Sequence, residues 1–166
     1  MGESGIMDYL PYLLALGIGV IAGLRALTAP AAVAWAAYLQ CGGFTLAATP
    51  LAFMGSIWAV GAFTLLALFE LVGDQLPSTP SRKVPMQFGA RLVMGGLAGA
   101  AIGAAHAMLV PGLVAGMVGA VIGTYGGAAF RGGLAKSFGR DLPAALVEDA
   151  IAIGGALLIV CAIPRP

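Results

Sequence analysis

The chain has 166 residues, of which 60% are hydrophobic and only 9% are charged, and its mean hydropathy is +1.00. These values exclude an ordinary soluble domain and indicate an integral membrane protein surrounded by a lipid bilayer. The net charge of +1 gives no basis for nucleic-acid binding.

Two long apolar stretches predict several membrane-spanning helices in one compact domain covering residues 1–166. The stretch from Ala26 to Phe69 has no charged side chain, and the stretch from Leu92 to Phe130 has only His106 as an ionisable base. One spanning helix needs about 20 apolar residues, so each stretch must contain more than one element. We expect an all-α polytopic bundle with five spans near 10–28, 50–73, 89–110, 112–130 and 143–163.

Prolines and glycines mark the expected breaks between these spans, at Pro30, Gly42–Gly43, Pro50 and Pro111–Gly112. The segment AAVAWAAYLQC, residues 31–41, is too short to cross a bilayer, and its Trp35 and Tyr38 suit the headgroup region. It predicts an interfacial or re-entrant half-helix.

Basic residues favour one side of the membrane. With five spans, the positive-inside rule places the amino terminus in the cytoplasm and the carboxyl terminus outside. If residues 31–48 also spanned, only the amino terminus would change sides. The acidic start MGESGIMDYL is unlike a cleaved signal peptide. The residues that share the cytoplasmic side are Arg82, Lys83, Arg91, Arg131, Lys136 and Arg140.

Glycines recur every fourth residue in two of the expected helices, and such stripes let helix backbones approach closely in lipid. They indicate either packing within one chain or contact with a second copy, and we expect a homo-oligomer. The stripes are Gly95, Gly99 and Gly103 in one helix, and Gly112, Gly116, Gly119, Gly123 and Gly127 in the next.

Two pairs of similar segments suggest an internal repeat. GVIAGLRALTAP (19–30) resembles GAVIGTYGGAAF (119–130), and GDQLP (73–77) resembles GRDLP (139–143). In a five-span topology the paired helices run in opposite directions, as in the inverted repeats of secondary transporters. Chance similarity between glycine- and alanine-rich segments is the alternative.

Charged residues within the apolar spans mark the candidate site, because a charge at bilayer depth costs on the order of 2.5–3.5 kcal/mol and needs a partner. They indicate either ion pairs that only stabilise the bundle or a polar cavity open to the cytoplasm that binds a small polar or charged solute. We expect the cavity, because Glu148 lies too far along its helix to be a surface anchor. The candidate residues are Arg25, Glu70, Asp74, Arg91, Arg131, Glu148 and Asp149, with Arg82 in the adjoining loop.

That loop, within FELVGDQLPSTPSRK (69–83), is stiffened by prolines and carries hydroxyl groups beside Arg82. It is placed to cover the mouth of the cavity. It lacks the glycines of a phosphate-binding loop, and the nearby acids are equally suited to a cation or a proton.

The segments AGLRALTAP, FELVGDQLPSTPSR, ARLVMGGLAGAAIG and ALVEDAIAI resemble those of an uncharacterised family of small bacterial inner-membrane proteins, catalogued as a domain of unknown function. The resemblance extends from about Leu16 to Ile159, and the loop GDQLPSTPSR is its most specific part. It implies a multi-pass protein of the bacterial inner membrane. It implies no activity, cofactor or catalytic residue.

Enzyme chemistry is poorly supported. His106 is the only histidine and is expected to pack in an apolar helix, with no second histidine for a metal site. A lipid-phosphate hydrolase using Glu70, Asp74 and Arg82 is a remote alternative. Cys41 and Cys161 are expected on the same outer side, either as separate thiols or as a disulfide.

These observations lead us to expect a transporter- or channel-like membrane protein without a cofactor, which binds or moves a small polar or charged solute. The alternative is a structural or partner-binding membrane protein whose charges only stabilise the bundle. The solute, the direction of movement and the coupling ion are not encoded in any motif of this chain.

Overall fold

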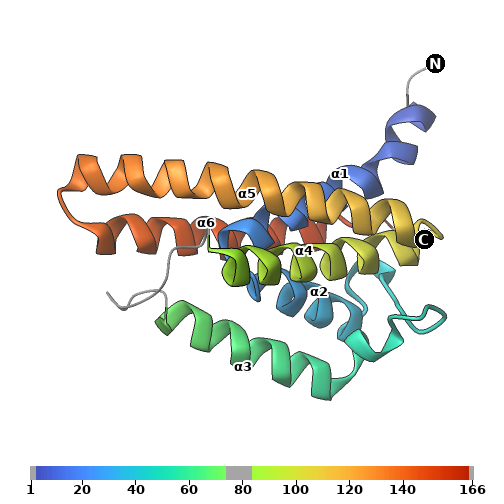
Figure 1. The fold of residues 1–166 in the computed structure, drawn as a ribbon. Coiled ribbons are helices and arrows are strands. Elements are labelled where there is room, and N and C mark those ends of the chain that lie inside the picture. The colour runs from blue at the N-terminus through green and yellow to red at the C-terminus, as the bar shows by residue number, and fades with distance from the viewer. Residues whose placement is uncertain (1–2, 74–83, 165–166) are drawn as a thin grey trace.

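The computed structural model describes residues 3–73 and 84–164, with side chains from Tyr9 onward. This described part is all-α, as the composition predicts. It contains two short 3-10 helices, η1 (Cys41–Gly43) and η2 (Ala52–Gly55), and six α-helices. The α-helices are α1 (Glu3–Leu24), α2 (Thr28–Tyr38), α3 (Ile57–Gly73), α4 (Pro85–Ala105), α5 (Leu109–Phe138) and α6 (Asp141–Cys161), arranged as in Figure 1.

Three of the described helices, α4, α5 and α6, are long and apolar enough to cross a membrane, fewer than the five expected. The first expected span ends at Leu24 rather than at residue 28, because the chain leaves the helix at Arg25. The second begins at Ile57 rather than at residue 50, because η2 occupies the preceding residues. The apolar segments Tyr9–Leu24 and Ile57–Gly73 are therefore shorter helices.

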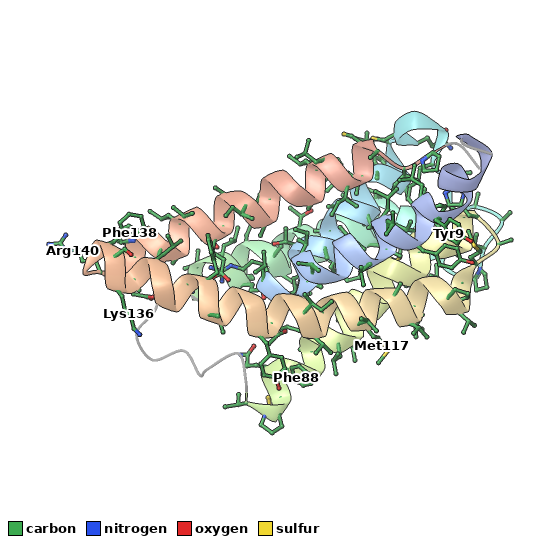
Figure 2. All side chains as sticks on the ribbon, turned by 90° about the horizontal axis from the view of Figure 1, so that it is seen from above. Tyr9, Phe88, Met117, Lys136, Phe138 and Arg140 are labelled. Carbon is green, nitrogen blue, oxygen red and sulfur yellow. The ribbon has the colours of Figure 1, made fainter. Side chains whose placement is uncertain are left out.

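The direction of α2 changes the expected topology. Figure 1 shows α1 running into the bundle, α2 turning back beside it, and α3 running again in the direction of α1. The start of α1 and the end of α6 consequently lie at the same end. Figure 2 shows Lys136 and Arg140 at the end opposite to Tyr9. The expectation that the amino terminus shares a side with the basic loops is therefore wrong.

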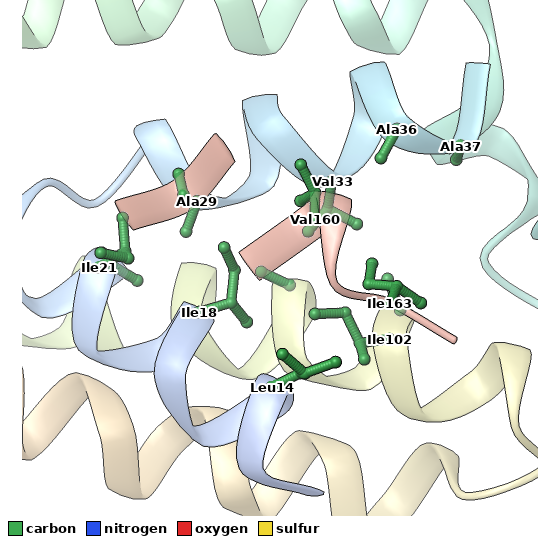
Figure 3. Close-up of a cluster of buried hydrophobic side chains, with 14 of the residues drawn as sticks. Leu14, Ile18, Ile21, Ala29, Val33, Ala36, Ala37, Ile102, Val160 and Ile163 are labelled. Carbon is green, nitrogen blue, oxygen red and sulfur yellow. The ribbon is translucent and has the colours of Figure 1, made fainter. Parts of the chain in front are cut away.

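The short helix α2 lies inside the bundle, and the choice between an interfacial and a re-entrant half-helix stays a prediction. Ala29, Val33 and Ala34 have no exposed surface. Figure 3 shows Ala29 and Val33 pointing from α2 toward Ile18 and Val160 in the main apolar core. Trp35 and Tyr38, on the outer face of α2, are 41% and 44% exposed.

Two prolines expected to break helices lie in first turns instead. Pro30 is the third residue of α2 and Pro111 is the third residue of α5. Backbone N–H groups of a first turn have no acceptor within the helix, so proline is tolerated there. The break between α4 and α5 falls at residues 106–108, where Ala107 has a left-handed φ of 58°.

Glycines bring three helices into backbone contact within the chain. A Cβ on Gly116 would lie 2.1 Å from the Gly95 carbonyl oxygen of the antiparallel helix α4. A Cβ on Gly123 would lie 2.1 Å from the Val20 carbonyl oxygen of α1. Gly119 and Gly123 of α5 therefore pack against α1 and do not need a second copy. The homo-oligomer stays a prediction that these stripes no longer support.

The same contacts show that the expected inverted repeat is wrong. Gly19 faces Gly116 and Gly23 faces Gly123, so residue numbers rise together and α1 runs parallel to α5. Residues 19–30 also contain the break after Leu24, whereas residues 119–130 form one continuous helix.

The topology predicts which positions react from the same side. An impermeant maleimide added to intact cells should label Cys161 and a cysteine replacing Tyr9 alike, either both or neither. A cysteine replacing Lys136 should show the opposite result, so that it reacts before permeabilisation only if the other two do not. Tyr9 and Cys161 are exposed and so accessible to the reagent. Each labelling variant also carries Cys41→Ala, which removes the second native thiol. Labelling of positions 9 and 136 from the same side would contradict this chain path.

Candidate functional site

The chain breaks between α1 and α2, at Arg25–Leu27, deep inside the bundle. Both Arg25 and the neighbouring Ala26 are buried. Arg25 contacts Asp149, which lies near the middle of α6. In Figure 1 the turn from α1 to α2 lies well inside the ends of α5 and α6. The break thus occurs at a buried position, where an unpaired backbone group would cost free energy.

Arg91 of α4 satisfies the carbonyl end of α1. Its Nη1 donates to the carbonyl oxygens of Gly23 and Leu24, at 2.8 and 2.7 Å. The last carbonyls of a helix have no partner within the helix and carry a partial negative charge. The buried guanidinium, 2% exposed as a residue, therefore stabilises this end by both hydrogen bonding and charge.

Glu70 of α3 satisfies the amide end of α2 in the same way. The N–H groups of Ala26 and Leu27 donate to Glu70 Oε1 and Oε2, at 2.7 and 2.8 Å. A carboxylate is favoured at a helix amino terminus, where the unpaired N–H groups carry a partial positive charge. The two new helix ends thus receive opposite charges from two different helices.

Arg25 lies between these ends and pairs with Asp149 of α6. Its Nε donates to Asp149 Oδ1 at 2.6 Å, and its Nη2 contacts the same oxygen. The Arg25 side chain has no exposed surface and that of Asp149 is 12% exposed. A buried charge of this kind needs its partner, because desolvation of either ion alone is costly.

Arg131 of α5 connects an exposed acid to a buried one. It donates to Asp141 from Nε and Nη2, at 3.1 and 2.6 Å. Its Nη1 lies 3.6 Å from Oε2 of Glu148, whose side chain has no exposed surface. Asp141 and Glu148 lie two turns apart on one face of α6, so one guanidinium reaches both.

We call Arg25, Glu70, Arg91, Arg131, Glu148 and Asp149 the charged break. It contains three cations and three anions, so its formal charge is zero (3 − 3). A charged solute entering this site must therefore exchange with an internal partner. The structure brings together all the candidate residues that it describes, while Asp74 and Arg82, with the loop expected to cover the site, lie outside the described residues.

Sequence reasoning missed Asp141, which shares Arg131 with Glu148. The spacing between Asp141 and Glu148 on one helix face was a usable signal for the shared arginine.

The remaining polar candidates lie apart from the charged break. Burial lowers the pKa of His106, which caps the carboxyl end of α4 in the turn before α5 rather than packing within a helix. Cys41 and Cys161 are free thiols in neighbouring segments, η1 and the end of α6. Among the described residues, no three histidine, cysteine, aspartate or glutamate side chains gather as a metal site.

Comparison with known proteins identifies no relative: no family model, curated protein or solved structure matches this chain. Its function must be argued from the charged break itself.

Proposed function

We propose that the protein binds and moves a small cation, either a proton or a monovalent metal ion, through the charged break. The observation that carries this proposal is the buried turn between α1 and α2, where the carbonyl end of α1 and the amide end of α2 are each matched by a charge from another helix. In many transporters, helix ends that lie within the bundle form the ion sites. We place the protein in the bacterial inner membrane, where a multi-pass carrier or channel would act.

The energetics support a functional origin of this arrangement. A continuous apolar helix would need neither Arg91 nor Glu70, and ionisable residues in membrane segments are costly and usually mark ion or proton pathways. Packing alone is served by the glycines, which bring the backbones together without charge. The charges therefore suggest a role beyond cohesion.

Glu148 is the residue best suited to exchange its partner for a cation. Arg131 makes two hydrogen bonds to Asp141 but lies 3.6 Å from Glu148, so the pair with Glu148 is the looser one. Movement of Arg131 toward Asp141 would weaken this contact of Glu148 and favour a proton or a metal ion in its place. Asp141, 65% exposed at its side chain, would hold Arg131 at the basic end of the bundle during the exchange.

Ion flux into proteoliposomes tests this function. Vesicles loaded with the pH-sensitive dye pyranine receive a pH gradient, with equal potassium on both sides and valinomycin to remove the membrane potential. Sodium and potassium fluxes are followed in separate vesicles without valinomycin, by uptake of radioactive sodium and rubidium tracers. We expect wild-type vesicles to dissipate at least one gradient several-fold faster than protein-free vesicles. Glu148→Gln should reduce the rate to that of protein-free vesicles, because the amide keeps the shape but removes the exchangeable charge.

The matched control is Lys136→Gln, which removes an exposed charge at the same end of the bundle. This variant should retain the wild-type rate. Both variants are first checked for wild-type helicity by circular dichroism. Flux that never exceeds the protein-free rate for protons, sodium and potassium would overturn the proposal.

The second candidate is a structural membrane protein whose charges only hold the bundle together. It is favoured by one specific observation: Glu70 and Arg91 each contact backbone groups of the broken helix and thus stabilise the turn directly. In this case Glu148→Gln would change stability without any flux to lose. A homo-oligomer is compatible with either candidate and is checked by native mass spectrometry.

A further inference from the structure

The carbonyl end of α1 carries a fixed cation at the kind of position where transporters hold a metal ion. In transporters built from interrupted helices, carbonyl oxygens at a helix carboxyl end coordinate sodium. In this protein the carbonyl oxygens of Gly23 and Leu24 accept from Arg91 Nη1, at 2.8 and 2.7 Å. An arginine side chain keeps its charge in proteins, so a metal ion here would meet a permanent cation. The position is already filled by the chain's own guanidinium.

Two acids of the charged break are held by donors of the chain in a similar way. Both carboxylate oxygens of Glu70 accept backbone N–H groups, and Asp149 accepts from Arg25 Nε at 2.6 Å. A metal ion would have to expel these donors, and it would also need several oxygen ligands to replace its hydration shell. A proton needs neither, because it adds to one carboxylate oxygen and neutralises the acid in place.

Glu148 is the acid best placed to take up that proton. Its Oε2 lies 3.6 Å from Arg131 Nη1, a longer contact than the 2.6 Å between Arg25 and Asp149. The side chains of Glu148, Arg131 and Asp141 are 0%, 17% and 65% exposed, so contacts lead stepwise from the solvent to the buried acid. The Glu148 carboxylate itself has no exposed surface for a metal ion with its ligands.

The charged groups beside Glu148 come from two of the helices that pack against α6. α5 contributes Arg131, and the residue that follows α1 is Arg25, which pairs with the neighbouring Asp149. α2, which also packs against α6, carries no charged residue. Protonation of Glu148 would therefore weaken its attraction to Arg131, which is held at Asp141 by two hydrogen bonds.

We infer that the cation bound at the charged break is a proton carried by Glu148, and that the three built-in guanidinium groups exclude metal ions. This inference rests on the proposed function and names its substrate. A proton from solution adds to a carboxylate oxygen of Glu148, so the acid becomes neutral and no other covalent bond changes. Arg131 keeps its charge and its hydrogen bonds to Asp141, and the formal charge of the charged break rises from zero to +1 (3 − 2).

Infrared difference spectroscopy tests proton binding without any transport. Protein in a supported lipid layer is perfused with buffers from about pH 9 to pH 4, and the carbonyl stretch of newly protonated carboxylic acids is recorded. We expect one band that is present in wild type, absent in Glu148→Gln and shifted to lower frequency in heavy water. Replacing N-methylglucamine with sodium or potassium at constant pH should leave the carboxylate bands unchanged.

Two variants serve as controls for the spectra. Glu148→Asp keeps a carboxyl group at the same position and should retain an acid band. Lys136→Gln removes an exposed charge at the same end of the bundle and should give the wild-type spectrum. Both variants, like Glu148→Gln, are first checked for wild-type helicity by circular dichroism.

The fluxes of protons and of the sodium and rubidium tracers complete the test. We expect proton flux several-fold above the protein-free rate and tracer uptake at the protein-free rate. Tracer uptake that depends on Glu148, or carboxylate bands that respond to sodium or potassium and disappear in Glu148→Gln, would overturn proton selectivity and leave cation transport in place. An acid band of Glu148 without any flux would support the proton site and overturn transport. Spectra in which wild type and Glu148→Gln show the same acid bands would overturn the inference.

Discussion

Asp149→Leu is expected to lower the free energy of unfolding by about 3–5 kcal/mol, one of the two largest effects of any single substitution that we predict. The change leaves Arg25 without its carboxylate partner, although the Arg25 side chain has no exposed surface. Burial of the guanidinium limits its access to water, so the loss of this carboxylate is costly. The measurement is unfolding in mixed micelles of a mild detergent and sodium dodecyl sulfate, followed by far-ultraviolet circular dichroism.

The double variant Arg25→Met/Asp149→Leu is the informative control. Replacing both ions of a buried pair with apolar residues of similar size is often neutral or stabilising, so the double variant should recover most of the lost stability. If it folds but does not move ions, the pair serves function. If Asp149→Leu alone is as stable as wild type, the pair of Arg25 and Asp149 does not contribute as the structure indicates.

Sequence reasoning predicted the helical class and the approximate positions of the apolar elements, because composition and hydropathy decide these directly. It did not predict where α1 ends. Pro30 was the natural candidate for that break, yet the chain leaves the helix at Arg25 and Pro30 lies within the next one. The reason is tertiary: Arg91 and Glu70, distant in sequence, stabilise two helix ends that local propensity would not create.

The sequence predicted which charged residues belong to the site, but not which acid contacts which arginine. Charges within apolar segments are rare enough to identify Arg25, Arg91, Glu148 and Asp149 as members of one cluster. Which acid meets which arginine depends on helix direction. The return of α2 inside the bundle makes α1 parallel to α5, and this single turn overturned both the inverted repeat and the expected side of the amino terminus.

Gly116→Ala is the second substitution expected to have a large effect. A Cβ at this position would lie 2.1 Å from the Gly95 carbonyl oxygen and 3.1 Å from the Gly99 Cα, both backbone atoms of α4. Neither can move aside as a side chain would, so α4 and α5 must separate. The free energy of unfolding should fall by about 3 kcal/mol, the upper part of the range for overpacking, when measured by the same detergent unfolding.

Gly126→Ala is the matched control, because it adds the same methyl group to the same helix at a position with nothing within 4 Å of the new Cβ. Alanine favours a helix over glycine by about 0.5–1 kcal/mol, so this variant should be as stable as wild type or more so. The two substitutions thus have opposite predicted signs. If Gly116→Ala were also neutral or stabilising, α4 and α5 would not pack backbone to backbone at this position, and the close contact of Gly116 with Gly95 and Gly99 would have to be abandoned.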